Sequence, residues 1–184
     1  MRGALALLLA AGAPAPPAAP TDAEITSIVS RVAIVVADLD ASKRFYTHAF
    51  GYRIQFEGEI GNRPAVREQL GLTGAQTARF AVLTNDQIVA GSRRDAAMIG
   101  LLAVGNPPPP VMRRPTGAGL AIGETMFAMR TTDIARVHAR LKALGARILV
   151  EPMRSPDGRE IELVVHDPDG TRLHVVERAE VLGK

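Results

Sequence analysis

The sequence predicts an α+β protein made of two tandem β-α-β-β-β units that form one pseudo-symmetric curved sheet around a cleft. One pattern occurs twice: an apolar run, an Asp, a helical stretch, a Gly and a second run of alternating apolar residues. The first copy starts at 32–36 and the second at 126–129. A turn sequence, Asp167-Pro168-Asp169-Gly170, then separates two further apolar runs and is typical of a β-hairpin.

The helix in each copy lies between residues that favour a helix start and a helix end. Asp38 or Asp40 in the first copy, and Asp133 in the second, can accept hydrogen bonds from the free N–H groups of a first helical turn. Gly51 and Gly145 supply the positive φ on which many helices end. The second helix has an apolar stripe that we expect to pack on a sheet, formed by Ile134, Val137, Leu141 and Leu144.

Further apolar runs complete each unit, at 78–83 and 98–103 in the first copy and at 160–166 and 172–176 in the second. Between the copies lies a Pro-rich stretch whose prolines can neither continue a helix nor donate to a central sheet. The two units and this linker are expected to form one domain over 30–178. The predicted segments are a leader at 1–20, a first unit at 30–105, a Pro/Gly-rich linker at 106–123 and a second unit at 124–178.

Composition limits the classes of function. With 184 residues, 47% of them hydrophobic, the chain can bury a full core without metal or disulfide support. It has no cysteine, which excludes thiol catalysis, zinc–thiolate sites and disulfides. The net charge is +3 and only 4% of the residues are aromatic, without a basic stripe, so we expect no nucleic-acid partner.

The N-terminus resembles a secretory signal peptide followed by an Ala/Pro-rich tether. Met1 and Arg2 precede an apolar stretch at 4–11 that is too short to span a bilayer as a helix. The Ala/Pro segment at 13–20 favours an extended chain with no core-forming content. We therefore expect a periplasmic or secreted protein without stable membrane insertion, with a cytoplasmic protein carrying an N-terminal tail as the alternative.

Several short motifs in this order resemble the vicinal oxygen chelate superfamily. They are Asp38-Leu39 followed by Ser42 and Phe45-Tyr46, the Leu-Lys-Ala-Leu-Gly sequence at 141–145, and the Asp-Pro-Asp-Gly hairpin. That superfamily includes glyoxalase I, extradiol dioxygenases, fosfomycin-modifying transferases, epimerases and bleomycin-resistance proteins. The resemblance extends over about 31–178, and it implies a fold more than a function, because this scaffold hosts many chemistries.

The resemblance also implies a divalent metal held by a His or Glu from the first and last strands of each unit. Carried onto this chain, those positions are Arg31, Gly100, Met126 and His174. Only His174 can bind a metal, and the permanent charge of Arg31 would repel one. Glu124 lies two residues before Met126 and so on the same strand face. We therefore expect no cofactor; if a metal does bind, His174 and Glu124 are the expected ligands.

A cleft is expected whether or not a metal binds. Strand alternation sends six predicted ligand-binding residues to one concave side: Arg31, Met98, Gly100, Met126, Arg172 and His174. Two arginines and a histidine beside methionines suit a small organic ligand that is anionic or carbonyl-bearing and has an apolar body. The sequence assigns no catalytic residue.

Three functions remain open at this point. The first is a metal-free small-molecule-binding protein, similar to the resistance members of the superfamily. The second is a metal-dependent lyase, isomerase or dioxygenase whose rearranged metal site uses His174 and Glu124. The third is a structural or interaction module with a vestigial cleft. A monomer or a homodimer is compatible with each of them.

Overall fold

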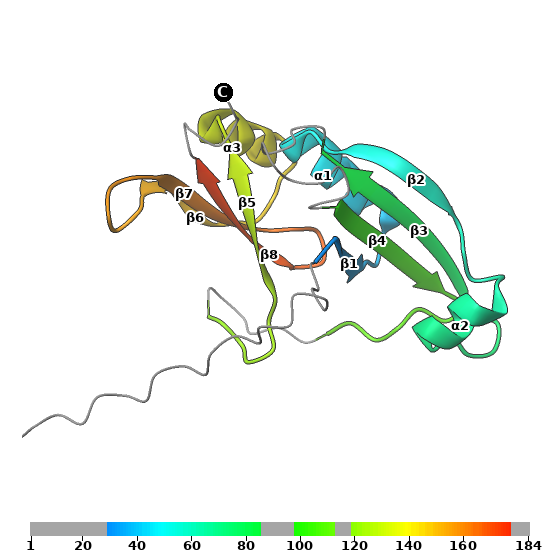
Figure 1. Cartoon of the computed structure of the whole chain (residues 1–184). Coiled ribbons are helices and arrows are strands. Elements are labelled where there is room, and N and C mark those ends of the chain that lie inside the picture. Colours follow the sequence, from blue (N-terminus) through cyan, green and yellow to red (C-terminus); the bar gives the residue numbers. More distant parts are fainter. Residues whose placement is uncertain (1–28, 86–97, 113–118, 178–184) are drawn as a thin grey trace, which may run out of the picture.

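The computed structural model describes residues 29–85, 98–112 and 119–177 and contains two four-stranded sheets (Figure 1). The first sheet has the strand order β1-β4-β3-β2, with β1 parallel to β4 and the other neighbours antiparallel. Its helix, α1, packs on one face. The strands are β1 (Arg31–Val35), β2 (Arg53–Glu59), β3 (Thr77–Thr84) and β4 (Met98–Gly105).

The second sheet repeats this topology with the order β5-β8-β7-β6, and here too the first strand runs parallel to the last. Helix α3 packs on one face of it. The strands are β5 (Met126–Thr131), β6 (Ile148–Arg154), β7 (Ile161–His166) and β8 (Arg172–Glu177). The predicted α+β fold with paired β-α-β-β-β units is therefore confirmed.

The two long helices begin and end where the sequence indicates. Before α1 (Leu39–Phe50), the Asp38 carboxylate accepts a hydrogen bond of 2.9 Å from a backbone N–H of the first turn. Before α3 (Ile134–Ala143), Asp133 does the same at 2.8 Å. Gly51, directly after α1, has a φ of 73°, which a residue with a side chain rarely adopts.

One hydrophobic core serves both units. Helices α1 and α3 lie against each other as well as against their own sheets (Figure 1). The core includes Tyr46 of α1 and Leu141 of α3, both fully buried, together with Leu101 of β4 and Leu173 of β8. Because these side chains belong to a single cluster, neither unit completes its core alone.

The Asp-Pro-Asp-Gly turn between β7 and β8 also joins the second unit to the first. Asp169 accepts a hydrogen bond of 2.9 Å from the backbone N–H of Ala37 and one of 3.2 Å from the Ser42 hydroxyl. The buried Tyr46 hydroxyl donates to Asp167 at 2.9 Å. The hairpin predicted from the sequence thus also binds, through Asp169, the start of α1 and the residue that precedes its N-cap.

A short helix, α2 (Pro64–Leu70), was not predicted. It buries none of its residues, so it has no apolar stripe that periodicity would reveal. Proline at its first position and Gly71 after it, with a φ of 63°, were the available local signals. Figure 1 shows α2 beyond the far ends of β2 and β3, away from the second sheet.

The predicted leader lies outside the described residues, as do the linker residues 113–118. Within the part of the chain that the structure describes, none of the helices has the length and apolar character needed to cross a membrane.

Candidate ligand-binding site

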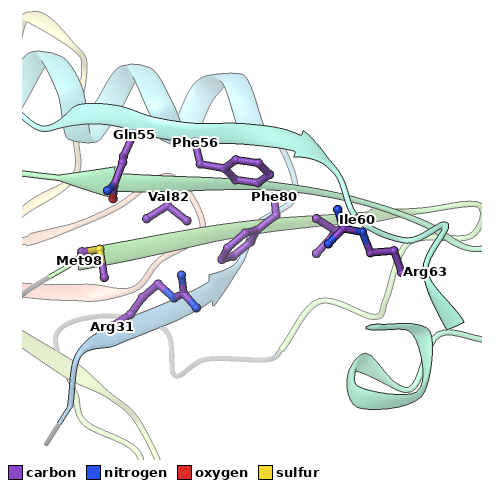
Figure 2. A pocket seen from close by; sticks show the side chains of 8 residues that line it. All are labelled: Arg31, Gln55, Phe56, Ile60, Arg63, Phe80, Val82 and Met98. Atoms are coloured by element: carbon purple, nitrogen blue, oxygen red, sulfur yellow. The ribbon is translucent and has the colours of Figure 1, made fainter. Parts of the chain in front are cut away.

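A pocket of about 550 Å³ lies on the first sheet (Figure 2). It occupies the face opposite α1, because its β3 residues alternate with Ala81 and Leu83 of the core. The residues that line it are Arg31, Gln55, Phe56, Ile60, Arg63, Phe80, Val82 and Met98.

Strand register brings these side chains together. Arg31 at the start of β1 is paired with Met98 at the start of β4. On the other side of β4, Val82 stands between Gly100 and Phe56 of the two neighbouring strands. Four strands therefore contribute to one surface, which is apolar in the middle and carries Arg31 at one margin.

Arg31 has a cation–π contact and, within the described part of the chain, no acidic partner. Its guanidinium carbon lies 5.4 Å from the centre of the Phe80 ring, within the range in which a cation is attracted to the ring face. Among the described residues, neither Arg31 nor Arg63 forms an ion pair. Both side chains are exposed, so their charges are available to a ligand.

Gly100 makes the contact between Arg31 and Phe80 possible. A Cβ atom at this position would lie 2.7 Å from the tip of the Phe80 ring and 3.4 Å from Cδ of Arg31. The first distance is shorter than real Cβ contacts allow, so any larger residue would displace the ring. Gly100, predicted as a ligand-binding residue, thus lies beneath two side chains of the pocket.

In the second unit, Arg172 is buried and forms hydrogen bonds with other groups of the protein. Its Nε donates to Glu124 at 3.1 Å, and both side chains are only 7% exposed. One terminal nitrogen donates to the carbonyl of Gly119 at 2.9 Å. These bonds attach the end of the linker to the start of β8.

His174 and Met126 lie on the second sheet and do not line the pocket. Along β8, His174 alternates with the core residues Leu173 and Val175, so it faces away from α3. Its Nε2 is 3.3 Å from a carboxylate oxygen of Glu162, and both side chains are about one quarter exposed, at 27% and 24%. Met126 is 51% exposed. The structure therefore brings Arg31, Met98 and Gly100 together and places Met126, Arg172 and His174 elsewhere.

A family model described as the Glyoxalase/Bleomycin resistance protein/Dioxygenase superfamily matches residues 28–175. The chain belongs to this superfamily. The resemblance inferred from the sequence motifs is thereby confirmed. No curated protein matches the chain in sequence.

Solved structures of the superfamily show the same fold. A glyoxalase family protein from Bacillus cereus has a TM-score of 0.69 and 19% identity, over 86% of this chain and 98% of that one. A glyoxylase/bleomycin resistance protein/dioxygenase domain from Frankia sp. has a TM-score of 0.54 and 21% identity, over 83% and 98%. Glyoxalase I from Zea mays has a TM-score of 0.57 and 20% identity, over 82% of this chain and 44% of that one. At such identities, the likeness shows the fold alone.

The residues of this superfamily member do not fit the divalent metal that the resemblance implies. The strand partner of Gly100 is Ala33 and that of His174 is Ala128, neither of which is a ligand. Glu124 is already engaged by Arg172. Across the described residues, no three His, Asp or Glu side chains converge in a way that could hold a metal ion.

Sequence reasoning missed most of the residues that line the pocket, namely Gln55, Phe56, Ile60, Arg63, Phe80 and Val82. For Phe80 and Val82 a signal existed, because they alternate with Ala81 and Leu83 along one strand. Gln55 lies at an irregularity in the pairing of β2 with β3, which strand alternation does not anticipate.

Proposed function

We propose that this superfamily member binds a small organic anion in the pocket on its first sheet, without a divalent metal. The observation that carries the proposal is the pair of arginines, Arg31 and Arg63, beside an apolar surface and without ion-pair partners among the described residues. A carboxylate can accept two parallel hydrogen bonds from a guanidinium, which makes such pairs strong and geometrically selective.

The rest of the pocket supports an apolar body attached to that anion. Phe56 is 47% exposed, a large fraction for a phenyl group, whereas Val82 beside it is 6% exposed. A ligand covering Phe56 would remove this apolar surface from water, at about 25 cal/mol for each Å². The volume of about 550 Å³ is within the range of small-molecule sites.

Binding is tested by isothermal titration and thermal shift of the full chain with aromatic and aliphatic carboxylates and their uncharged amides. We expect Arg31→Gln to weaken carboxylate binding about tenfold or more, because a hydrogen bond to a charged group contributes roughly 1.5–3 kcal/mol. Arg140→Gln is the control, since Arg140 is exposed on α3, far from the pocket in the fold. Equal affinity of the Arg31→Gln variant would contradict the proposal, and no binding of any anion would favour an interaction module.

The metal-dependent alternative rests on one observation, the approach of His174 to Glu162 at 3.3 Å, since both side chains can bind a metal. The purified protein is analysed for metal content and titrated with nickel, zinc, manganese and ferrous iron. We expect no stoichiometric binding. Stoichiometric binding that is lost in His174→Ala would instead support a lyase, isomerase or dioxygenase with a rearranged site.

We also propose that the protein is exported, as a monomer or homodimer with no nucleic-acid partner. The support is the signal-peptide-like sequence at the N-terminus. In a bacterial host, a C-terminally tagged full chain should appear in the periplasm with its leader removed. N-terminal sequencing and sedimentation measure both properties, and an intact cytoplasmic chain would contradict export.

A further inference from the structure

We infer that the anion taken by this pocket is a flat, conjugated carboxylate, an inference that rests on the proposed function. The observation behind it is that both phenyl groups of the pocket lean over glycines. The tip of the Phe80 ring lies where a Cβ of Gly100 would be, at 2.7 Å, and the tip of the Phe56 ring lies 3.2 Å from the Cβ position of Gly58.

The two glycines determine how the rings lie. A phenyl group normally stands up from a strand among its neighbours' side chains. Here Phe80 extends from β3 across the position of Gly100 on β4, and Phe56 extends along its own strand over Gly58. Both rings therefore lean onto the sheet and form, with Val82 beside them, a low apolar floor (Figure 2).

One guanidinium lies over this floor and the other lies at its margin. Arg31 is 5.4 Å from the Phe80 ring centre, and Figure 2 shows Arg63 on the side where Ile60 lies. A carboxylate that pairs with Arg31 therefore brings the group attached to it over the phenyl rings. A flat aromatic group gains ring–ring contact there, whereas a puckered saturated group of equal charge does not.

The test compares 2-naphthoate with its fully saturated analogue, decahydronaphthalene-2-carboxylate, and with the uncharged 2-naphthamide, by calorimetric titration of the full chain. We expect naphthoate to bind about two- to tenfold more tightly than the saturated acid, which is the usual range for aromatic pairing beyond area burial. The amide should bind most weakly. Equal affinity of the two acids would overturn the flat-ligand inference and leave anion binding intact, while no binding of either acid would overturn both proposals.

Variants of Phe80 and Gly100 test whether the preference for the aromatic acid comes from the apolar floor. Phe80→Leu should bring the affinities of the two acids to about the same value while carboxylate binding persists, and Gly100→Ala should also reduce the preference by displacing the ring. Gly105→Ala on the same strand is the matched control, because its Cβ would meet only the Thr77 hydroxyl, at 3.3 Å. A full preference retained in Phe80→Leu would contradict the inference, and that variant does not depend on whether Gly100→Ala folds.

Discussion

The guanidinium groups of Arg31 and Arg172 have opposite surroundings, although each residue is the first of a strand. Arg31 begins β1 at the edge of the first sheet, and Arg172 begins β8 inside the second. Arg172 is buried against Glu124, and its charge is neutralised within the protein. Arg31 is exposed beside Phe80 and pairs with no described carboxylate. Only the surroundings of Arg31 leave a cation for a ligand, so Arg31 belongs to the proposed site, whereas Arg172 is part of a buried ion pair.

The buried pair leads to a prediction about stability. Glu124→Gln should lower the free energy of unfolding by about 3–5 kcal/mol, because it leaves the charge of Arg172 buried without its carboxylate. Urea denaturation measures this change. Glu59→Gln is the matched control, since Glu59 is 60% exposed and lies 3.7 Å from Arg79, and it should cost less than about 1 kcal/mol.

A second variant checks the cause of that loss. Glu124→Leu combined with Arg172→Met removes both charges, and it should recover much of the stability that Glu124→Gln loses. If the single and double variants unfold at the same urea concentration, the loss does not come from an uncompensated charge.

At the level of elements, α2 is held by polar contacts in place of a buried face. The Arg67 side chain donates to the carbonyls of Gly61 at 3.0 Å, Gln76 at 2.8 Å and Gly74 at 2.8 Å. These three carbonyls belong to the segments that enter and leave the helix, so one side chain is hydrogen-bonded to both segments. Since Ile60 and Arg63 precede α2 and line the pocket, these contacts of Arg67 also support one side of the proposed site.

Arg67→Ala should therefore loosen α2 more than the rest of the molecule. Three hydrogen bonds from a charged donor are lost, and we expect the opening free energy of the α2 amides to fall by about 1–3 kcal/mol. Hydrogen exchange measures this locally, and the amides of α3 should be unaffected. Arg44→Ala, at an exposed position of α1, is the control. Unchanged protection of α2 would show that these bonds do not hold the helix.

At the scale of the whole molecule, the two units are joined by a shared core and by the hairpin that meets α1. The contact between Tyr46 and Asp167 is part of both. Burial raises the pKa of Tyr46 well above its ordinary value, and the Asp167 carboxylate raises it further. Burial also raises the pKa of Tyr52, the other tyrosine of the chain.

Alkaline pH should therefore weaken the joined structure. Each tyrosine has a higher pKa in the folded chain than in the unfolded chain. Its contribution to stability is therefore complete below the ordinary tyrosine pKa of 10.0 and is lost as the pH rises above that value. The loss should be at most about 1.4 kcal/mol per pH unit for each tyrosine. Phenolate absorbance should rise together with the loss of helical circular dichroism, and Tyr46→Phe should make the pH dependence shallower. Phenolate appearing near pH 10 in an intact fold would contradict this.

The fold was predictable because its signals are local. Asp38 and Asp133 cap helices within a few residues of themselves, and the Asp-Pro-Asp-Gly turn closes a hairpin from its own sequence. Helix α2 was missed because it buries none of its residues and so has no apolar periodicity.

For the site, alternation along single strands predicts which face of a strand a residue is on, but it placed no limit on which strands share a pocket. Arg31 and Met98 meet through the pairing of β1 with β4. The sequence by itself determined the two units and their capped helices, because periodicity and turn chemistry act over a few residues, and its motifs resemble the superfamily whose family model matches the chain. Only the tertiary structure decided that Arg172 is neutralised by Glu124 and that Phe80 lies over Gly100 beside Arg31. The physical reason is that these contacts join residues far apart in the chain, and strand register alone brings such residues within reach of one another.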